Sequence, residues 1–336
     1  PICYGRGGDL PTISDANMVL GRLDVGKLKP LPGAVDIEDI RRIFQARLGD
    51  PLGVDAETAA AAVLRMATTR MAGATRMVSV SLGLDPRDFS LFAFGGAGPL
   101  HASALAGELG VPEVLVPARP GITNALGCIV ADLRHDFVRT VNRPLDGMEI
   151  DRLTGMLEHQ AGEGEALIRQ EPVRIEAIDV THSLDMQFAG QTHLLSGPLE
   201  SAEMTRADIQ KAFEEVYYNS FRVRLPEIRA QIVNVNTSVT GRRPEVDLAG
   251  LIDKSARAGS VAAAQTASRP VWFDGGGAES CWQDTPVYAR EKLPLDARLA
   301  GPAILEQMDT TILIEPQDSA VSDDDGNIFV TVGRAS

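Results

Sequence analysis

Apolar positions recur every three or four residues in the first part of the chain, which predicts helices there. The strongest predicted helix spans residues 55–83, with Asp55 placed to cap its first turn and Gly83 placed to end it. We expect one face of this helix to be buried through a stripe of apolar positions: Val63, Ala67, Met71, Ala74, Val78 and Leu82. Shorter helices are predicted over residues 14–23 and 36–48.

Strands and helices alternate in the next part of the chain. Strands are predicted at residues 89–94 and 113–117, and a helix follows each of them, at 99–109 and at about 122–133. This alternation predicts βαβ units and a parallel sheet that is buried on both faces. Ligands of such sheets bind at the carboxyl ends of the strands, so the loop after the first strand lies where a ligand site is expected.

The second half of the chain mixes both patterns. The elements predicted in its middle part are a polar helix at 151–171, two strands around the turn Ala189-Gly190, an amphipathic helix at 206–219 and a strand at 231–240. A stretch rich in Ala, Ser, Gly and Gln at 241–268 is typical of a linker, and short strands interrupted by Pro and Gly follow it. We therefore expect three parts: an α/β lobe at 1–140, an α+β continuation at 141–245 and a β-rich domain at 246–336.

Composition and charge limit the possible partners. The chain has 336 residues, of which 44% are hydrophobic and 23% charged, as is ordinary for a compact globular protein. Its formal net charge is -14, and only five of its 32 cationic residues are lysine. A surface for nucleic acid is therefore disfavoured, because such a surface needs clustered positive charge. No apolar stretch reaches the length that spans a membrane.

The cysteines bear on the cellular compartment, and the start of the sequence bears on whether it is part of a longer polypeptide. The three cysteines, Cys3, Cys128 and Cys281, form no C-x-x-C pair, which argues against a disulfide framework or a structural zinc site and favours a reducing, cytoplasmic compartment. The sequence begins without methionine and without a targeting pattern. We expect it to be a fragment or a processed part of a longer polypeptide.

The most informative motif is an apolar strand that breaks on Gly95, Gly96 and Gly98 and leads directly into a helix. Such a junction leaves backbone N-H groups unpaired at the positive end of the helix dipole, and glycine lets a ligand approach them closely. The motif is therefore either a tight turn with nothing bound or part of a nucleotide site.

The spacing excludes two familiar nucleotide motifs. A dinucleotide fingerprint would need a third glycine where His101 stands. A phosphate loop of the G-x-x-x-x-G-K-[ST] type would need a lysine that follows neither this loop nor the glycines at 275–277.

Three polar residues near glycines are candidates for chemistry. His101 lies in the first turn after the loop, where it either contacts a phosphate, a ribose or a metal-bound water, or is satisfied by the backbone. Asp15 and Asn17 either cap a helix or serve a ligand, and Asp15 suits Mg²⁺ because that ion prefers oxygen ligands. No pair of histidines has zinc-ligand spacing, and no motif indicates a serine or cysteine nucleophile.

Six segments resemble the carboxyl-terminal part of the hydantoinase A/5-oxoprolinase family, in the expected order and across nearly the whole chain: Cys3–Leu23, Phe94–Ala102, Pro120–Gly127, Ala131–Phe137, Ser183–Thr192 and Gly301–Thr311. The resemblance implies an α/β fold, the second lobe of an actin/Hsp70/sugar-kinase-like (ribonuclease-H-like) ATPase core with a smaller β-rich C-terminal domain. It also implies ATP and Mg²⁺ as cofactors.

The site residues that we expect on this basis are Gly95, Gly96, Ala97, Gly98 and Asn17 for the nucleotide, Asp15 and His101 for catalysis, and Asp15 for the metal.

The resemblance further implies a reaction in which ATP phosphorylates the carbonyl of a cyclic amide and so drives ring opening. Family members carry two phosphate loops that this sequence lacks, so we expect the chain to be inactive alone. Its expected partners are the missing amino-terminal half and a hydantoinase B-like subunit in an oligomer. Two alternatives stay open: a subunit of an ATP-dependent ketone carboxylase of the acetone or acetophenone type, and a non-catalytic module that docks a partner subunit. The substrate, whether a hydantoin, 5-oxoproline, another lactam or a ketone, also stays open.

Overall fold

The computed structural model describes residues 1–28, 33, 35–199, 204–225, 228–247, 255–274 and 280–333. The chain forms two compact units: unit 1 contains residues 1–126 and 247–336, and unit 2 contains residues 127–246. The glycines at 275–277 and residues 248–254 of the predicted linker lie outside the described residues. The linker prediction is wrong at both ends of 241–268, because residues 241–242 and 265–268 belong to strands and 261–264 form a short helix. In the part of the chain that is described, no helix is both long and apolar enough to cross a membrane.

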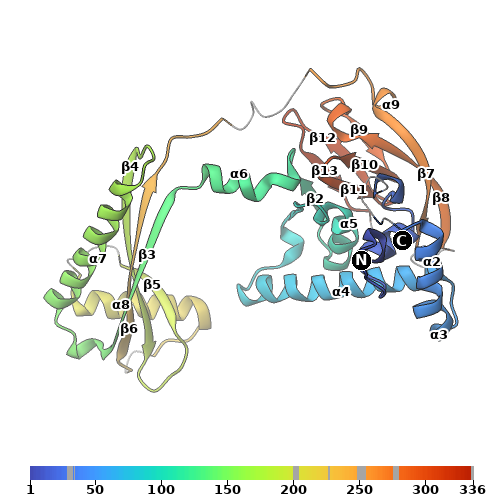
Figure 1. The fold of residues 1–336 in the computed structure, drawn as a ribbon. Coiled ribbons are helices and arrows are strands. Elements are labelled where there is room, and N and C mark those ends of the chain that lie inside the picture. The colour runs from blue at the N-terminus through green and yellow to red at the C-terminus, as the bar shows by residue number, and fades with distance from the viewer. Residues whose placement is uncertain are drawn as a thin grey trace. The chain divides into compact units, whose positions relative to one another are not determined.

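Unit 1 contains two sheets and a group of helices (Figure 1). Its helices are α1 (Ile13–Val19), α2 (Ile37–Phe44), α3 (Asp50–Leu52), α4 (Ala56–Ser81), α5 (Gly98–Leu109) and α9 (Val261–Ala264), and α6 (Thr123–Val130) crosses the boundary to unit 2. Its strands are β1 (Leu91–Phe92), β2 (Glu113–Val116), β7 (Gln265–Phe273), β8 (Cys281–Ala289), β9 (Arg298–Ala300), β10 (Ala303–Gln307), β11 (Thr310–Ile314), β12 (Ser319–Ser322) and β13 (Ile328–Thr331).

The first sheet of unit 1 has the strand order β1-β2-β13-β12-β9, and the second has the order β11-β10-β8-β7. β1 and β2 pair in parallel as predicted, but the other neighbour of β2 is the antiparallel β13. The expectation of a purely parallel sheet is therefore wrong. The strand that completes the sheet comes from the far end of the chain, which a local pattern of strands and helices does not reveal.

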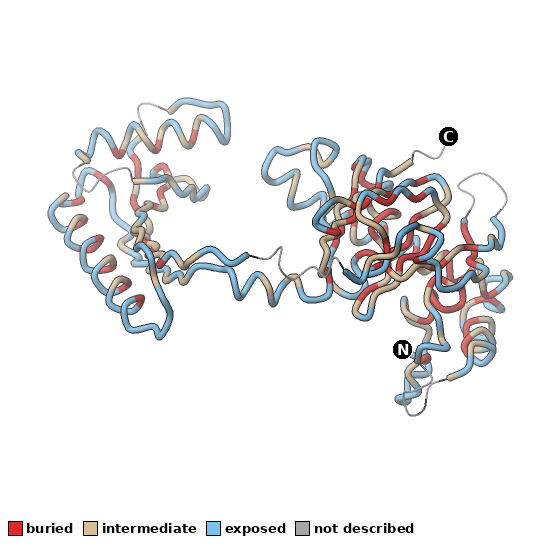
Figure 2. Tube along the Cα trace, turned by 90° about the horizontal axis from the view of Figure 1, so that it is seen from above, coloured by how far each residue is buried: buried red, intermediate tan, exposed pale blue. Residues whose placement is uncertain are grey.

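Our expected division at 1–140, 141–245 and 246–336 differs from these two units. The β-rich end of the chain does not stand apart, because β13 pairs with β2 and because α5 packs against β11. Figure 2 shows buried positions throughout the unit that carries both ends of the chain. One apolar core joins them, with members as far apart in sequence as Val114 and Val330.

The long helix α4 begins where the sequence predicts, since the Asp55 carboxylate accepts a hydrogen bond from the Thr58 N-H at 2.7 Å. Its buried face differs from the predicted stripe, and consists of Ala56, Ala59, Ala60, Ala61, Leu64, Thr68 and Ala72. α1, α2 and α5 contact α4. Beyond Ala72 no residue of the helix is buried, and Val78 and Leu82 are 65% and 68% exposed. Helical periodicity predicted the helix, but the elements that pack on it decide which face is buried.

Unit 2 is an antiparallel sheet with the strand order β3-β6-β4-β5, packed against two helices. Its elements are β3 (Leu133–Pro144), α7 (Ile150–Gln170), β4 (Ala177–Phe188), β5 (Leu195–Leu199), α8 (Arg206–Phe221) and β6 (Ala230–Arg242). The two helices share one core with β4 and β6, in which Phe213 and Tyr217 stack edge-on against Phe188. The predicted helix at 122–133 ends earlier, because Leu133 already belongs to β3.

Candidate functional site

The glycine loop between β1 and α5 is held from two sides. The Gly95 N-H donates to the carbonyl of Pro120 at 2.7 Å. The Thr310 hydroxyl lies 3.2 Å from the carbonyl oxygens of both Gly95 and Gly96, to which it donates. Gly95 has a φ of +82°, a conformation that glycine adopts at little cost. The loop therefore has a defined backbone shape that is fixed by segments distant in sequence.

The side of this loop that would meet a ligand is open. A Cβ placed on Gly95 or Gly98 would meet no atom within 4 Å, and one on Gly96 would meet only the carbonyl oxygen of Asp309 at 3.3 Å. Ala97, the N-cap of α5, offers no side-chain hydrogen bond to the first turn of the helix. Of the first residues of α5, Pro99 has no N-H and the Leu100 N-H donates to the Ala97 carbonyl at 3.2 Å, so a negatively charged or polar ligand would be bound by the Gly98 N-H and those of the preceding loop.

Two residues that the sequence analysis did not select support this loop. Thr310 anchors it directly, and Asp309 lies so close to Gly121 that a Cβ there would be 2.1 Å from Asp309 Oδ2. Asp309 Oδ1 is buried, and no residue of the described part of the chain bonds to it. Both residues belong to the segment Gly301–Thr311, one of those that carry the family resemblance. That resemblance was the one feature of the sequence that could have pointed to them.

Asp15 is buried and its carboxylate is fully engaged by the protein. Oδ1 accepts from the Cys3 N-H at 2.9 Å, and Oδ2 accepts from the Ile2 N-H, the Thr12 N-H and the Thr12 hydroxyl at 3.1, 3.0 and 2.7 Å. Burial by itself would raise the pKa of Asp15, but the hydrogen bonds from Thr12, Cys3 and Ile2 outweigh it and lower the pKa below its ordinary value. The arrangement gives Asp15 a structural role at the start of α1.

This carboxylate fits Mg²⁺ poorly, because both oxygens already accept hydrogen bonds from the protein. Within the described ranges, no group of three or more His, Cys, Asp or Glu side chains is placed to hold a metal ion. Catalysis or metal binding by Asp15 therefore stays a prediction. Either role would require the carboxylate to give up some of these hydrogen bonds in order to bind the metal ion or the substrate.

Asn17 and His101 are brought together by the fold. Asn17 is 1% exposed, and its Nδ2 donates to the Ile13 carbonyl at 2.9 Å and lies 3.4 Å from His101 Nε2. Burial lowers the pKa of His101 to about 4, with a further contribution from the positive charge of Arg22. The imidazole is therefore neutral at neutral pH and can accept a hydrogen bond.

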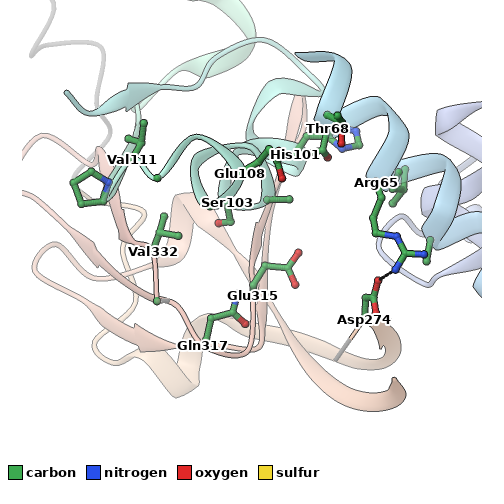
Figure 3. Close-up of a pocket in the computed structure, with 18 of the residues that line it drawn as sticks. Arg65, Thr68, His101, Ser103, Glu108, Val111, Asp274, Glu315, Gln317 and Val332 are labelled. Carbon is green, nitrogen blue, oxygen red and sulfur yellow. Dashed lines mark hydrogen bonds and ion pairs between the residues drawn. The ribbon is translucent and has the colours of Figure 1, made fainter. Parts of the chain in front are cut away.

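Arg22 connects this pair to the end of β11. Its guanidinium lies 3.6 Å from the carboxylate of Glu315, and the two side chains are 10% and 14% exposed. Burial raises the pKa of Glu315, while the positive charge of Arg22 acts in the opposite direction. His101, Arg22 and Glu315 all line one cavity of about 730 Å³ in unit 1 (Figure 3). No sequence pattern placed these three residues in one site, since they lie on separate segments.

Comparison with known proteins gives matches along the whole chain. The family model described as Hydantoinase/oxoprolinase matches residues 1–137, and that of the Hydantoinase/oxoprolinase C-terminal domain matches residues 154–330. The caprolactamase subunit alpha of Pseudomonas jessenii is 31% identical over 94% of this chain and 45% of its own length. The acetophenone carboxylase gamma subunit of Aromatoleum aromaticum is 29% identical over 97% of this chain and 45% of its own length.

A solved structure shows the same fold. The crystal structure of the ATP-dependent caprolactamase from Pseudomonas jessenii aligns with a TM-score of 0.78 and 28% identity, over 99% of this chain and 48% of that one. The predicted fold class, one lobe of an actin-like ATPase core with a β-rich C-terminal part, is confirmed. The chain spans about half the length of the relatives it matches here.

Proposed function

Because this chain belongs to the hydantoinase/oxoprolinase family, we propose that it is one part of an ATP-dependent enzyme that opens cyclic amides. The proposal concerns the whole enzyme, in which an amino-terminal half and a hydantoinase B-like subunit complete the site. The observation that carries it is the open glycine loop, Gly95 to Gly98, in front of an uncapped helix start. The caprolactamase relatives, one of which is described as ATP-dependent, support the reaction class.

The loop suits one side of an adenine nucleotide. Its backbone N-H groups and the dipole of α5 favour a phosphate or ribose oxygen, and the glycines allow the ligand to approach the backbone closely. Gly95, Gly96, Ala97 and Gly98 would line the nucleotide, and Asn17 would hold His101 near it. Mg²⁺ would accompany the phosphates, as it does in phosphoryl transfer generally.

ATP would make the amide reactive. An amide carbonyl is a weak electrophile, and its ring nitrogen is a poor leaving group. Transfer of the γ-phosphoryl group to the carbonyl oxygen forms a P-O bond, releases ADP and leaves a carbon that water can attack. Loss of phosphate and cleavage of the C-N bond then give the open amino acid, so that ATP, amide and water become ADP, phosphate and product. The His101 imidazole, neutral because its pKa is lowered to about 4, would act in this sequence by accepting a hydrogen bond that orients a substrate or a water molecule.

A ketone carboxylase is the second candidate, and the match to the acetophenone carboxylase gamma subunit favours it. A screen of substrate-dependent ATP hydrolysis by the full complex distinguishes the two. Hydantoin, 5-oxoproline and lactams would stimulate an amide-opening enzyme, whereas a ketone with bicarbonate would stimulate a carboxylase.

Nucleotide binding to the full-length protein tests the site itself. Mg-ADP at about 100 times its Kd is expected to stabilise the protein by about 2.7 kcal/mol, which corresponds to a rise in Tm of about 2–4 °C for a protein of this size. Gly96→Asp places a carboxylate in the loop and is expected to abolish this rise. Gly259→Asp is the control for the added charge, because Gly259 lies outside the loop and a Cβ there meets nothing within 4 Å.

Two results would contradict the proposal, and each points to a different explanation. If Mg-ADP gives no rise in the wild-type protein, the chain is a non-catalytic assembly module. If Gly96→Asp keeps the full rise, the nucleotide binds elsewhere.

A further inference from the structure

A cavity in unit 1 lies between the helices α4 and α5 and the ends of β11 and β13 (Figure 3). Its volume of about 730 Å³ falls in the range of pockets that enclose small organic molecules. It is distinct from the open face of the glycine loop, since none of Gly95 to Gly98 lines it. His101, in the first turn of α5, lines the cavity and follows that loop directly in sequence.

One side of the cavity carries buried polar groups. In Figure 3 the Glu315 carboxylate points into the cavity and His101 lies across from it. Arg22 lies 3.6 Å from Glu315 and is 8% exposed, and its Nε has no hydrogen-bond partner among the described residues. Buried polar groups normally have partners, and leaving one unsatisfied costs about 1–3 kcal/mol. Arg22 Nε is itself enclosed by the protein, so a ligand in the cavity would meet the Nη groups of the guanidinium as the donor, beside the Glu315 carboxylate as the acceptor.

Aliphatic side chains line the other end of the cavity, beside the polar Gln317 and Arg87. Ala104, Val111, Pro112 and Val332 line it, and Figure 3 places Val111 and Val332 at the end opposite the ion pair of Arg65 and Asp274. A ligand with a short hydrocarbon part would bury it against these side chains, at roughly 25 cal/mol per Å² of apolar surface removed from water.

We propose that this cavity binds a small uncharged cyclic amide, with its N-H toward Glu315, its carbonyl toward Arg22 and its methylene groups against Val111 and Val332. A ring amide presents a donor and an acceptor on neighbouring atoms, which matches a carboxylate beside a guanidinium. An uncharged ligand fits because Arg22 and Glu315 balance each other, so a charged ligand would leave one charge buried without compensation. The inference rests on the proposed function and names where the amide would bind.

In this arrangement Glu315 and Arg22 orient the amide. The shared helix α5 links the two sites, because its first turn carries His101 toward the cavity and begins at the nucleotide loop. A carbonyl held at Arg22 would therefore lie on the side of the cavity that faces His101.

Calorimetric titration of the full-length protein with ε-caprolactam, and separately with Mg-ADP, tests the inference. Glu315→Gln is expected to weaken lactam binding at least tenfold and to change the Kd of Mg-ADP less than twofold, because the charged acceptor is lost while the loop is intact. Glu38→Gln is the control. Glu38 lies on α2, is not among the residues that line the cavity, is 75% exposed and pairs with Arg41, so its replacement should leave both affinities unchanged.

A second variant tests the aliphatic side. Ala104→Leu fills space in the cavity without disturbing helix formation, and should weaken the seven-membered ε-caprolactam at least fivefold more than the five-membered 2-pyrrolidinone. Equal losses for the two rings, or no loss, would overturn the assignment of this side.

The outcomes separate this inference from the proposed function. If Glu315→Gln binds lactam as the wild type does while Mg-ADP still stabilises the protein, the inference fails and the function stands. If lactam and nucleotide affinities fall together in Glu315→Gln, Glu315 is structural and the inference also fails. If Mg-ADP gives no stabilisation but lactam binding depends on Glu315, the proposed nucleotide function fails and the cavity keeps its ligand.

Discussion

Lowering the pH is expected to destabilise unit 1 through His101. The pKa of His101 is lowered to about 4 in the folded protein because the ring is buried and because Arg22 is nearby, whereas its ordinary value is 6.5. Between these two values the unfolded chain binds a proton that the folded chain does not. The stability that His101 contributes is therefore fully present above about pH 6.5, and it is lost as the pH falls toward 4.

The magnitude follows from the size of this shift. Each unit of pKa corresponds to 1.36 kcal/mol, so a change from 6.5 to about 4 amounts to about 3 kcal/mol, of which about 2 kcal/mol is lost by pH 4.5. His101→Gln removes the titrating group and keeps a neutral polar side chain. The variant should therefore lose about 2 kcal/mol less stability than the wild type between pH 7.5 and pH 4.5.

Urea unfolding followed by tryptophan fluorescence measures the stability of unit 1, where His101 lies. The chain has two tryptophans, Trp272 and Trp282, and both belong to unit 1, as His101 does. His159→Gln is the control, because His159 lies on α7 in unit 2 and its side chain is 75% exposed. If wild type and His101→Gln lose the same stability within about 0.5 kcal/mol, His101 is not held neutral by its surroundings and the reasoning is refuted.

Two further changes test packing and hydrogen bonding. Gly164→Ala should destabilise unit 2 by about 1–3 kcal/mol in urea unfolding followed by circular dichroism, because its Cβ would lie 2.4 Å from Val239 Cγ2. Gly155→Ala in the same helix meets nothing within 4 Å and should stabilise by up to about 1 kcal/mol, so equal effects of the two changes would contradict the packing. Asp15→Asn should lower the free energy of unfolding of unit 1 by about 2–3 kcal/mol, because an amide keeps one acceptor oxygen where the carboxylate accepts four hydrogen bonds. A loss below about 1 kcal/mol in tryptophan-monitored urea unfolding would show that these bonds are not needed for the fold.

The sequence by itself determined the local structure. Helix periodicity and capping residues predicted α4 and α8 to within a few residues, since these signals depend on neighbours along the chain. The glycine motif at Gly95–Gly98 was visible for the same reason, because a break between a strand and a helix is a local event. The resemblance to the family, also read from the sequence, supplied the fold class.

Only the tertiary structure decided what packs against these elements. β13 completes the sheet beside β2, and Thr310 fixes the glycine loop from 215 positions along the chain. The contact between Asn17 and His101 and the pair of Arg22 and Glu315 likewise join distant segments, and both polar clusters are buried. Periodicity carries no information about such contacts, because they depend on which surfaces the whole chain can bury together. The same reason explains why the second half of α4 is helical and yet exposed: propensity forms a helix, and burial requires a partner.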